Sequence, residues 1–161
     1  MLTITSFEEL LGLHRRPVAV KFQESAPEGI ARINETAASG CVYWKLAAEG
    51  RTFYTESADH FGCPIGAHTH GIALPDETAS ELEDLVSTMV DLQYISMEEV
   101  PEIPQLTGDF GVAIYAPLSE ATFQPDVVLL SGNAKQMMFL AEAAHAAGVS
   151  SDTSMVGRPT C

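Results

Sequence analysis

The chain has 161 residues, of which 46% are hydrophobic and 19% are charged, the composition of an ordinary globular domain. Its 22 acidic and 8 basic residues give a net charge of −14, which argues against nucleic acid and anionic membranes, because both require clustered Lys and Arg. No apolar run reaches the ~20 residues of a membrane span, and the N-terminus lacks the pattern of a signal peptide. We therefore expect one cytoplasmic domain over residues 1–161.

The first elements are indicated by capping and β-prone patterns. Residues 6–13 predict a short amphipathic helix, with Ser6 as N-cap and Glu9 completing a capping box. Residues 17–22 predict a strand that begins at a proline, a position where a missing backbone donor is tolerated. The polar residues 23–34 predict a loop.

A second helix is predicted over residues 41–48, because Ser39 or Gly40 can cap it. Cys41 then lies in its first turn, where the positive end of the helix dipole favours a thiolate. Residues 51–55 are β-prone and predict a strand.

Further along, an apolar stripe of helical spacing predicts a structural helix over residues 77–91 with a solvated acidic face. Residues 93–104 contain two prolines and predict a linker. Two continuous apolar runs, 111–116 and 126–130, predict buried strands, and residues 134–147 predict a final helix. This mixture predicts an α/β or α+β fold, a single domain with a mixed sheet flanked by helices.

The stretch 59–70 concentrates metal-ligand chemistry. It reads Asp-His-Phe-Gly-Cys-Pro-Ile-Gly-Ala-His-Thr-His and contains Cys63, His60, His68 and His70. Its glycines and proline predict a tight loop whose backbone can approach a ligand closely.

Together these residues make the chain similar to the uncharacterised ArCR family, also called domain of unknown function 169. The resemblance rests on five segments in order: Pro17 to Phe22, Gly40-Cys41 with Trp44 and Ala47, Asp59 to Gly66, Pro125 to Leu130, and Gly157 to Cys161. It implies that the three cysteines, 41, 63 and 161, belong to one site. Family members usually continue past the Thr-Cys motif, so the resemblance also suggests a shortened member, or ligands supplied by a neighbouring subunit.

The leading functional hypothesis is therefore an iron–sulfur protein in which Cys41, Cys63 and Cys161 hold a cluster, expected as [4Fe-4S], for electron transfer or redox chemistry. Three thiolates near glycine-rich backbone suit a cubane with one iron left for a histidine (the candidates are His60, His68 and His70), solvent or a substrate. We also expect a homo-oligomer with the cofactor near a subunit contact.

Three alternatives stay open at this stage. The first is a zinc or other mononuclear site that uses Cys63, His68 and His70, with Cys41 as a further ligand. The second is a thiol enzyme with Cys63 as nucleophile and His60 or His68 as base. The third is a cofactor-free domain that binds a small molecule or a protein. The sequence names no substrate or redox partner and does not decide whether the protein is an enzyme.

Overall fold

The computed structural model describes residues 4–35, 37, 40–60, 63–73, 76–103 and 105–149. Five α-helices, four strands and three short 3₁₀ turns occur in these segments. In chain order they are α1 (Ile4–Leu11), β1 (Val18–Gln23), α2 (Gly40–Ala48), β2 (Phe53–Glu56), η1 (Ser57–His60), α3 (Pro64–Thr69), α4 (Asp76–Asp91), η2 (Val100–Glu102), β3 (Val112–Pro117), η3 (Leu118–Glu120), β4 (Val127–Leu129) and α5 (Ala134–Ala146).

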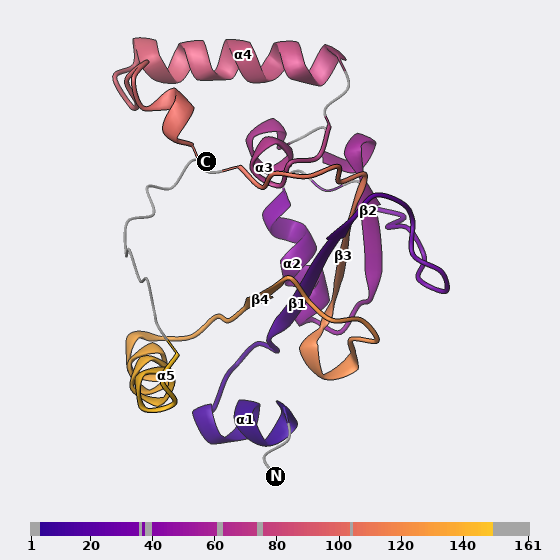
Figure 1. Ribbon diagram of the computed structural model, residues 1–161, viewed down its shortest axis with the longest axis vertical. Helices are drawn as coiled ribbons and strands as arrows, with labels where there is room; N and C mark the ends of the chain where they lie inside the picture. The colour runs from indigo at the N-terminus through magenta and orange to yellow at the C-terminus, as the bar shows by residue number, and fades with distance from the viewer. Residues whose placement is uncertain are drawn as a thin grey trace.

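The strands form one antiparallel sheet in the order β2-β3-β1-β4 (Figure 1). The register brings Phe53, Tyr115, Val20 and Val127 into one row across the four strands. Because directly paired residues of an antiparallel sheet lie on the same face, this row and its neighbours two positions along each strand form one apolar face. That face carries both the core and the candidate site.

Helix α2 covers this face and completes the core. Its Tyr43 is fully buried and contacts the rings of Phe53 and Tyr115, with centroids 6.1 and 5.9 Å away. Ala47 is also fully buried, so the helix approaches the sheet closely. The predicted helix 41–48 and strand 17–22 are thus confirmed within one residue of their bounds.

The predicted tight loop over residues 59–70 is wrong, because η1 and the helix α3 occupy most of it. Pro64 lies in the first turn of α3, where its missing N–H costs no helical hydrogen bond. Gly66 lies within the helix for a steric reason. A Cβ at this position would lie 2.7 Å from the Cys63 sulfur, so the thiol uses the space that glycine leaves free.

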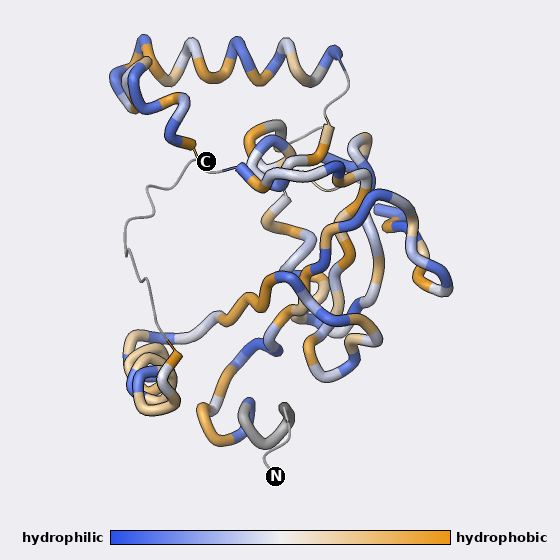
Figure 2. The backbone as a smooth tube through the Cα atoms, in the orientation of Figure 1, coloured by the Kyte–Doolittle hydropathy of each residue, from blue (hydrophilic) through white to orange (hydrophobic). Residues whose placement is uncertain are grey.

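Strand β4 forms where residues 126–130 predicted it, but the expectation that it is buried is wrong. Its three residues, Val127, Val128 and Leu129, are 38 to 41% exposed, and the strand lies at one end of the sheet. Figure 2 shows the hydrophobic colour continuing along this segment. A continuous apolar run therefore marked an edge strand here, whereas in β3 the same pattern marked a fully buried one.

Helices α4 and α5 lie away from the sheet (Figure 1). None of the α4 side chains that the structure describes is buried, so its apolar stripe is not part of the core. Helix α5 begins with a capping box between Asn133 and Gln136, and the Gln136 amide donates to the carbonyls of Leu11 and Gly12 at the end of α1.

The fold class expected from the sequence is confirmed as a mixed α/β arrangement, and the antiparallel pairing places it with α+β folds. Within the described segments, every helix is too short or too polar to cross a lipid bilayer. The cytoplasmic location and the self-association expected from the sequence stay predictions.

Candidate functional site

A cavity of about 790 Å³ opens between the apolar face of the sheet, helices α2 and α3, and the segment 94–106. Most of its wall is apolar or aromatic, and its polar side chains are few. The wall consists of Val20, Phe22, Tyr115, Val127 and Leu129 from the sheet, Gly40 and Trp44 from α2, Thr69 and His70 from the end of α3, and Tyr94, Ile95, Glu99, Glu102, Ile103, Gln105 and Leu106 from the segment 94–106. Its volume and lining are those of a typical small-molecule site.

His70 lines this wall, and one of its ring nitrogens is buried beneath the surface. It directly follows α3, and its ring lies 5.2 Å from that of Phe22, centroid to centroid. Its Nδ1 atom is buried and has no hydrogen-bond partner among the described residues. Burial lowers the pKa of His70, so the ring favours its neutral form. A buried polar atom without a partner costs free energy, and the neutral ring keeps that cost lower than a charged ring would.

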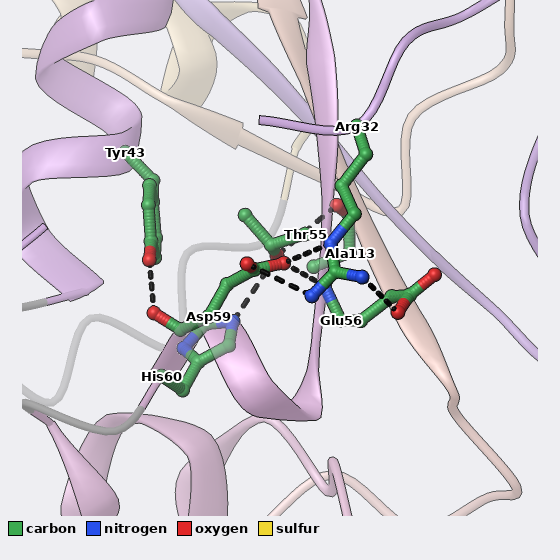
Figure 3. Close-up of polar contacts among 7 residues, drawn as sticks. All are labelled: Arg32, Tyr43, Thr55, Glu56, Asp59, His60 and Ala113. Atoms are coloured by element: carbon green, nitrogen blue, oxygen red, sulfur yellow. Dashed lines mark hydrogen bonds and ion pairs between the residues drawn. The ribbon is translucent and has the colours of Figure 1, made fainter. Parts of the chain in front are cut away.

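Behind His70 lies a second buried histidine, His60, the last residue of η1, which is only 1% exposed. The two rings meet edge to face, with centroids 6.2 Å apart. On one side of the His60 ring, Nε2 lies 3.1 Å from the Thr55 hydroxyl (Figure 3). On the other side, Nδ1 is buried and has no partner within the described segments.

The Thr55 contact favours one tautomer of His60. The Thr55 hydroxyl donates to the backbone carbonyl of Ala113 at 3.4 Å, so its oxygen is left to accept a hydrogen bond from His60 Nε2–H. Nδ1 then carries the lone pair. Burial, with a smaller contribution from His70, lowers the pKa of His60 to about 4, so the ring stays neutral at physiological pH.

The turn η1 that positions His60 is held by a polar network. Both carboxylate oxygens of Asp59 accept from the Arg32 guanidinium, at 3.0 and 3.1 Å, and one of them also accepts from the backbone N–H of Glu56 at 2.7 Å. Arg32 forms a second ion pair with the Glu56 carboxylate at 2.7 Å. The Tyr43 hydroxyl donates to the carbonyl of Asp59 (Figure 3). These bonds tie η1 to both β2 and α2.

Of the residues that the sequence singled out, His60 and Cys63 lie beside Gly40, and the ring of His70 contacts that of His60. A Cβ on Gly40 would lie 3.8 Å from the Cys63 sulfur and 3.9 Å from His60 Nδ1. Cys63 is the half-buried residue directly before α3. Gly40 is itself part of the cavity wall, whereas Cys63 and His60 are not and lie behind it.

The other predicted site residues do not join this cluster. Cys41 lies in the first turn of α2, as expected, and is exposed. His68 lines a separate, smaller hollow of about 550 Å³ beside α4. Cys161 lies outside the described residues.

The iron–sulfur hypothesis, with Cys41, Cys63 and Cys161 as ligands, is wrong on this evidence. In the described part of the chain, no group of three or more His, Cys, Asp or Glu side chains has a geometry that could hold a metal ion. The same finding overturns the mononuclear alternative on Cys63, His68 and His70, because α3 directs His68 and His70 to different hollows. Residues 64–69 form a helix in place of the predicted tight loop, and this helix separates His68 from His70 in direction.

Cys63 and His60 lie near each other, as the thiol-enzyme alternative requires, but Asp59 does not orient His60 as that alternative expects. Asp59 binds Arg32 rather than orienting His60, and Thr55 takes the orienting position. A histidine whose pKa is lowered to about 4 is a weak base for deprotonating a thiol. The geometry therefore does not support a thiol enzyme that uses Cys63 and His60.

Several residues of the site had no functional signal in the sequence. Thr55 lies on the buried face of β2, two positions from Phe53, and strand alternation could have placed it there. From the sequence alone, Phe22, Tyr115 and Trp44 would be assigned to the core, and in the structure they do belong to it or pack against it. That they also border a cavity depends on the distance between α2 and the segment 94–106, which no local pattern encodes.

The family comparison agrees with the resemblance seen in the sequence. The model of the uncharacterised ArCR family, DUF169, matches residues 6–161. No curated protein and no solved structure gives a significant match. The match spans nearly the whole chain, including the sheet, Gly40, η1 and α3, and the protein therefore belongs to the uncharacterised ArCR family, domain of unknown function 169.

Proposed function

We propose that the protein binds a small, largely apolar molecule in the cavity between the sheet, α2, α3 and the segment 94–106. The observation that carries the proposal is the cavity itself, about 790 Å³ in volume, with a largely apolar wall that includes the rings of Phe22, Trp44 and Tyr115. Sites of 300 to 1,000 Å³ with apolar walls and a few polar groups are typical of small-molecule binding.

Charge narrows the class of ligand. Glu99 and Glu102 are the charged side chains in the wall, and the whole chain carries a net charge of −14. An anionic ligand would be repelled during approach and would lose hydration without gaining a cationic partner in the wall. A neutral or cationic molecule with an aromatic or aliphatic body fits this environment.

Trp44 offers a direct test, because it is the only tryptophan of the chain and lines the cavity. N-phenyl-1-naphthylamine is a neutral apolar probe that accepts excitation energy from tryptophan. Titration of the protein with this probe should quench Trp44 emission and saturate at one equivalent. An unsaturable or absent response would contradict the proposal.

Strand β4 provides a matched pair of variants. Val127 lines the cavity, whereas Val128, its neighbour of similar exposure, is not in the wall. Val127→Phe should intrude on the cavity and weaken probe binding by about tenfold, whereas Val128→Phe should leave it unchanged. Equal effects of the two substitutions would show that the probe binds elsewhere.

A further inference from the structure

The charges in the cavity wall are all of one sign and all come from one side. The sheet and α2 contribute aromatic and aliphatic side chains, such as the buried ring of Tyr115. The segment 94–106 contributes Glu99 and Glu102, and among the described residues no Lys or Arg lines the wall. His70, also in the wall, favours its neutral form because burial lowers its pKa. A ligand therefore meets mainly apolar surface, with negative charge on the side of the segment 94–106.

We propose that the cavity selects a cationic amine, with its ammonium group against Glu99 and Glu102 and its aromatic or aliphatic body against the sheet and α2. The inference rests on the proposed function and narrows its ligand class from neutral or cationic molecules to ammonium compounds. Opposite charges attract each other more strongly in a cavity than in bulk water, because the effective dielectric constant is lower there. A neutral ligand of the same shape gains nothing from the two carboxylates.

The backbone around η2 brings the two carboxylates to the same side. Glu99 is the residue directly before η2, with a helical backbone conformation, and Glu102 is its last residue. In a 3₁₀ turn, side chains three positions apart lie one above the other, and Glu99 and Glu102 have this spacing. The Glu99 carboxylate also accepts from the backbone N–H of Ser96 at 2.8 Å, which limits its rotation. The negative charge at the wall is therefore held by local structure before any ligand binds.

A neighbouring hollow of about 430 Å³ carries the opposite charge. It shares Trp44 and Leu129 with the cavity and is lined by Arg15 and Arg16, with no acidic side chain among its described residues. The Arg15 guanidinium carbon lies 5.7 Å from the centroid of the Trp44 ring, so Arg15 occupies one face of that ring. The basic groups of this region thus line the other hollow, and an ammonium ligand in the cavity meets no positive charge in its wall.

The experiment compares two probes of nearly equal size that differ in charge. The first, 1-naphthylmethylamine, is an ammonium ion at neutral pH, and the second, 1-naphthylmethanol, is neutral. Isothermal titration calorimetry with the full chain measures both dissociation constants. The alcohol is the more hydrophobic probe, so an apolar cavity alone would prefer it. The full chain should instead bind the ammonium about tenfold more tightly. Equal affinities, or a preference for the alcohol, would overturn the inference.

Glu102→Gln and Glu98→Gln form a matched pair of variants. Both residues are exposed and each substitution removes one negative charge, but Glu102 lines the cavity and Glu98 does not. Glu102→Gln should weaken ammonium binding by about fivefold and change alcohol binding by less than about twofold. Glu98→Gln should weaken ammonium binding by less than about twofold. Equal losses in the two variants would show that the ammonium responds to the overall charge of the protein, and the assignment to this cavity would be wrong.

The inference and the proposed function fail in different ways. If the alcohol binds and Val127→Phe weakens it, but the ammonium has no advantage, the charge selectivity is wrong and the proposed function stands. If neither probe binds, or if Val127→Phe affects neither, both are wrong.

Discussion

The region of the sheet with α2 and the region of α4 each contain a helix with apolar residues at helical spacing, but the two helices lie in opposite environments. On the sheet side, Tyr43 and Ala47 of α2 are fully buried against β3 and its neighbours. In α4, an equally regular apolar stripe leaves Leu85 38% exposed, and no described side chain of the helix is buried. Figure 2 shows hydrophobic and hydrophilic turns alternating along α4. Periodicity predicts that a helix forms, but only its contacts with the rest of the fold decide whether its apolar face is buried.

The candidate site lies where these two regions meet. Its inner wall, with Phe22, Tyr115 and Gly40, belongs to the buried region, and its outer wall comes from the segment 94–106 that follows α4. The side chains of Phe22 and Tyr115 in the inner wall are buried, whereas none of the described side chains of the segment 94–106 is buried. This arrangement suits a site that must hold a ligand firmly and still admit it.

The largest expected difference between the regions concerns stability. Tyr43→Ala should reduce the free energy of unfolding by about 3 to 5 kcal/mol, because it leaves a large cavity beneath α2. Leu85→Ala in α4 should cost less than about 1 kcal/mol. Urea denaturation followed by circular dichroism measures both. Comparable losses would show that α4 is part of the core after all.

The pH dependence of stability should identify His60 as a buried neutral group. Its pKa is about 4 in the folded protein, compared with an ordinary value of 6.5, so the unfolded chain binds a proton more readily between these two values. Its contribution is therefore fully present above about pH 6.5 and is lost as the pH falls towards 4. Unfolding at pH 5 should require about 2 kcal/mol less than at pH 7.5 on account of this group.

His60→Gln is the control for this pH effect. Glutamine can still donate to Thr55 but does not titrate, so the difference in pH dependence between the two proteins isolates His60. Identical pH profiles would show that the imidazole is not held neutral by burial.

Thr55→Val should test the support behind His60. The substitution preserves shape but leaves the His60 Nε2–H buried without a partner, which should cost about 1 to 2 kcal/mol of unfolding free energy. Thr55→Ser keeps the hydroxyl and should recover most of that loss. Equal free energies of unfolding for the valine and serine variants would show that the 3.1 Å contact between the Thr55 hydroxyl and His60 Nε2 contributes little to stability.

The smallest effect is expected on the acidic face of α4. Glu81 is exposed, so Glu81→Ala should change the free energy of unfolding by no more than about 0.5 kcal/mol and leave probe binding unaltered. Thermal denaturation and the Trp44 titration provide the two measurements. A loss of probe binding in Glu81→Ala would show that α4 contributes to the binding site.

The sequence predicted most elements of the fold because each depends on local chemistry, such as the capping residues of α5 and the β-prone run of β1. The sequence prediction failed at α3, where Pro64 and Gly66 resemble loop residues but lie in a helix. Glycine occurs within this helix because the Cys63 sulfur occupies the space that a side chain at position 66 would need. The sequence prediction also grouped Cys63 with the histidines of residues 59–70 by their proximity along the chain. Helical geometry separates His68 from His70, so that only His70 reaches the cavity.

The parts of the site that sequence could not predict depend on contacts between distant segments. His60 was a candidate from the sequence, but its environment depends on Thr55 and the Ala113 carbonyl, which belong to two neighbouring strands. The cavity requires α2 and the segment 94–106 to lie on opposite sides of one space. No spacing of residues along the chain encodes such a separation.

The most direct test of the central claim is the location of a bound probe. With 1-naphthol at saturation, intermolecular nuclear Overhauser effects should connect its ring protons to both Trp44 on α2 and Phe22 on β1, which line the same cavity from different elements. Contacts to these two side chains would place the probe between the helix and the sheet. Contacts confined to the exposed Met138 and Phe139 of α5 would contradict the claim that this cavity is the binding site.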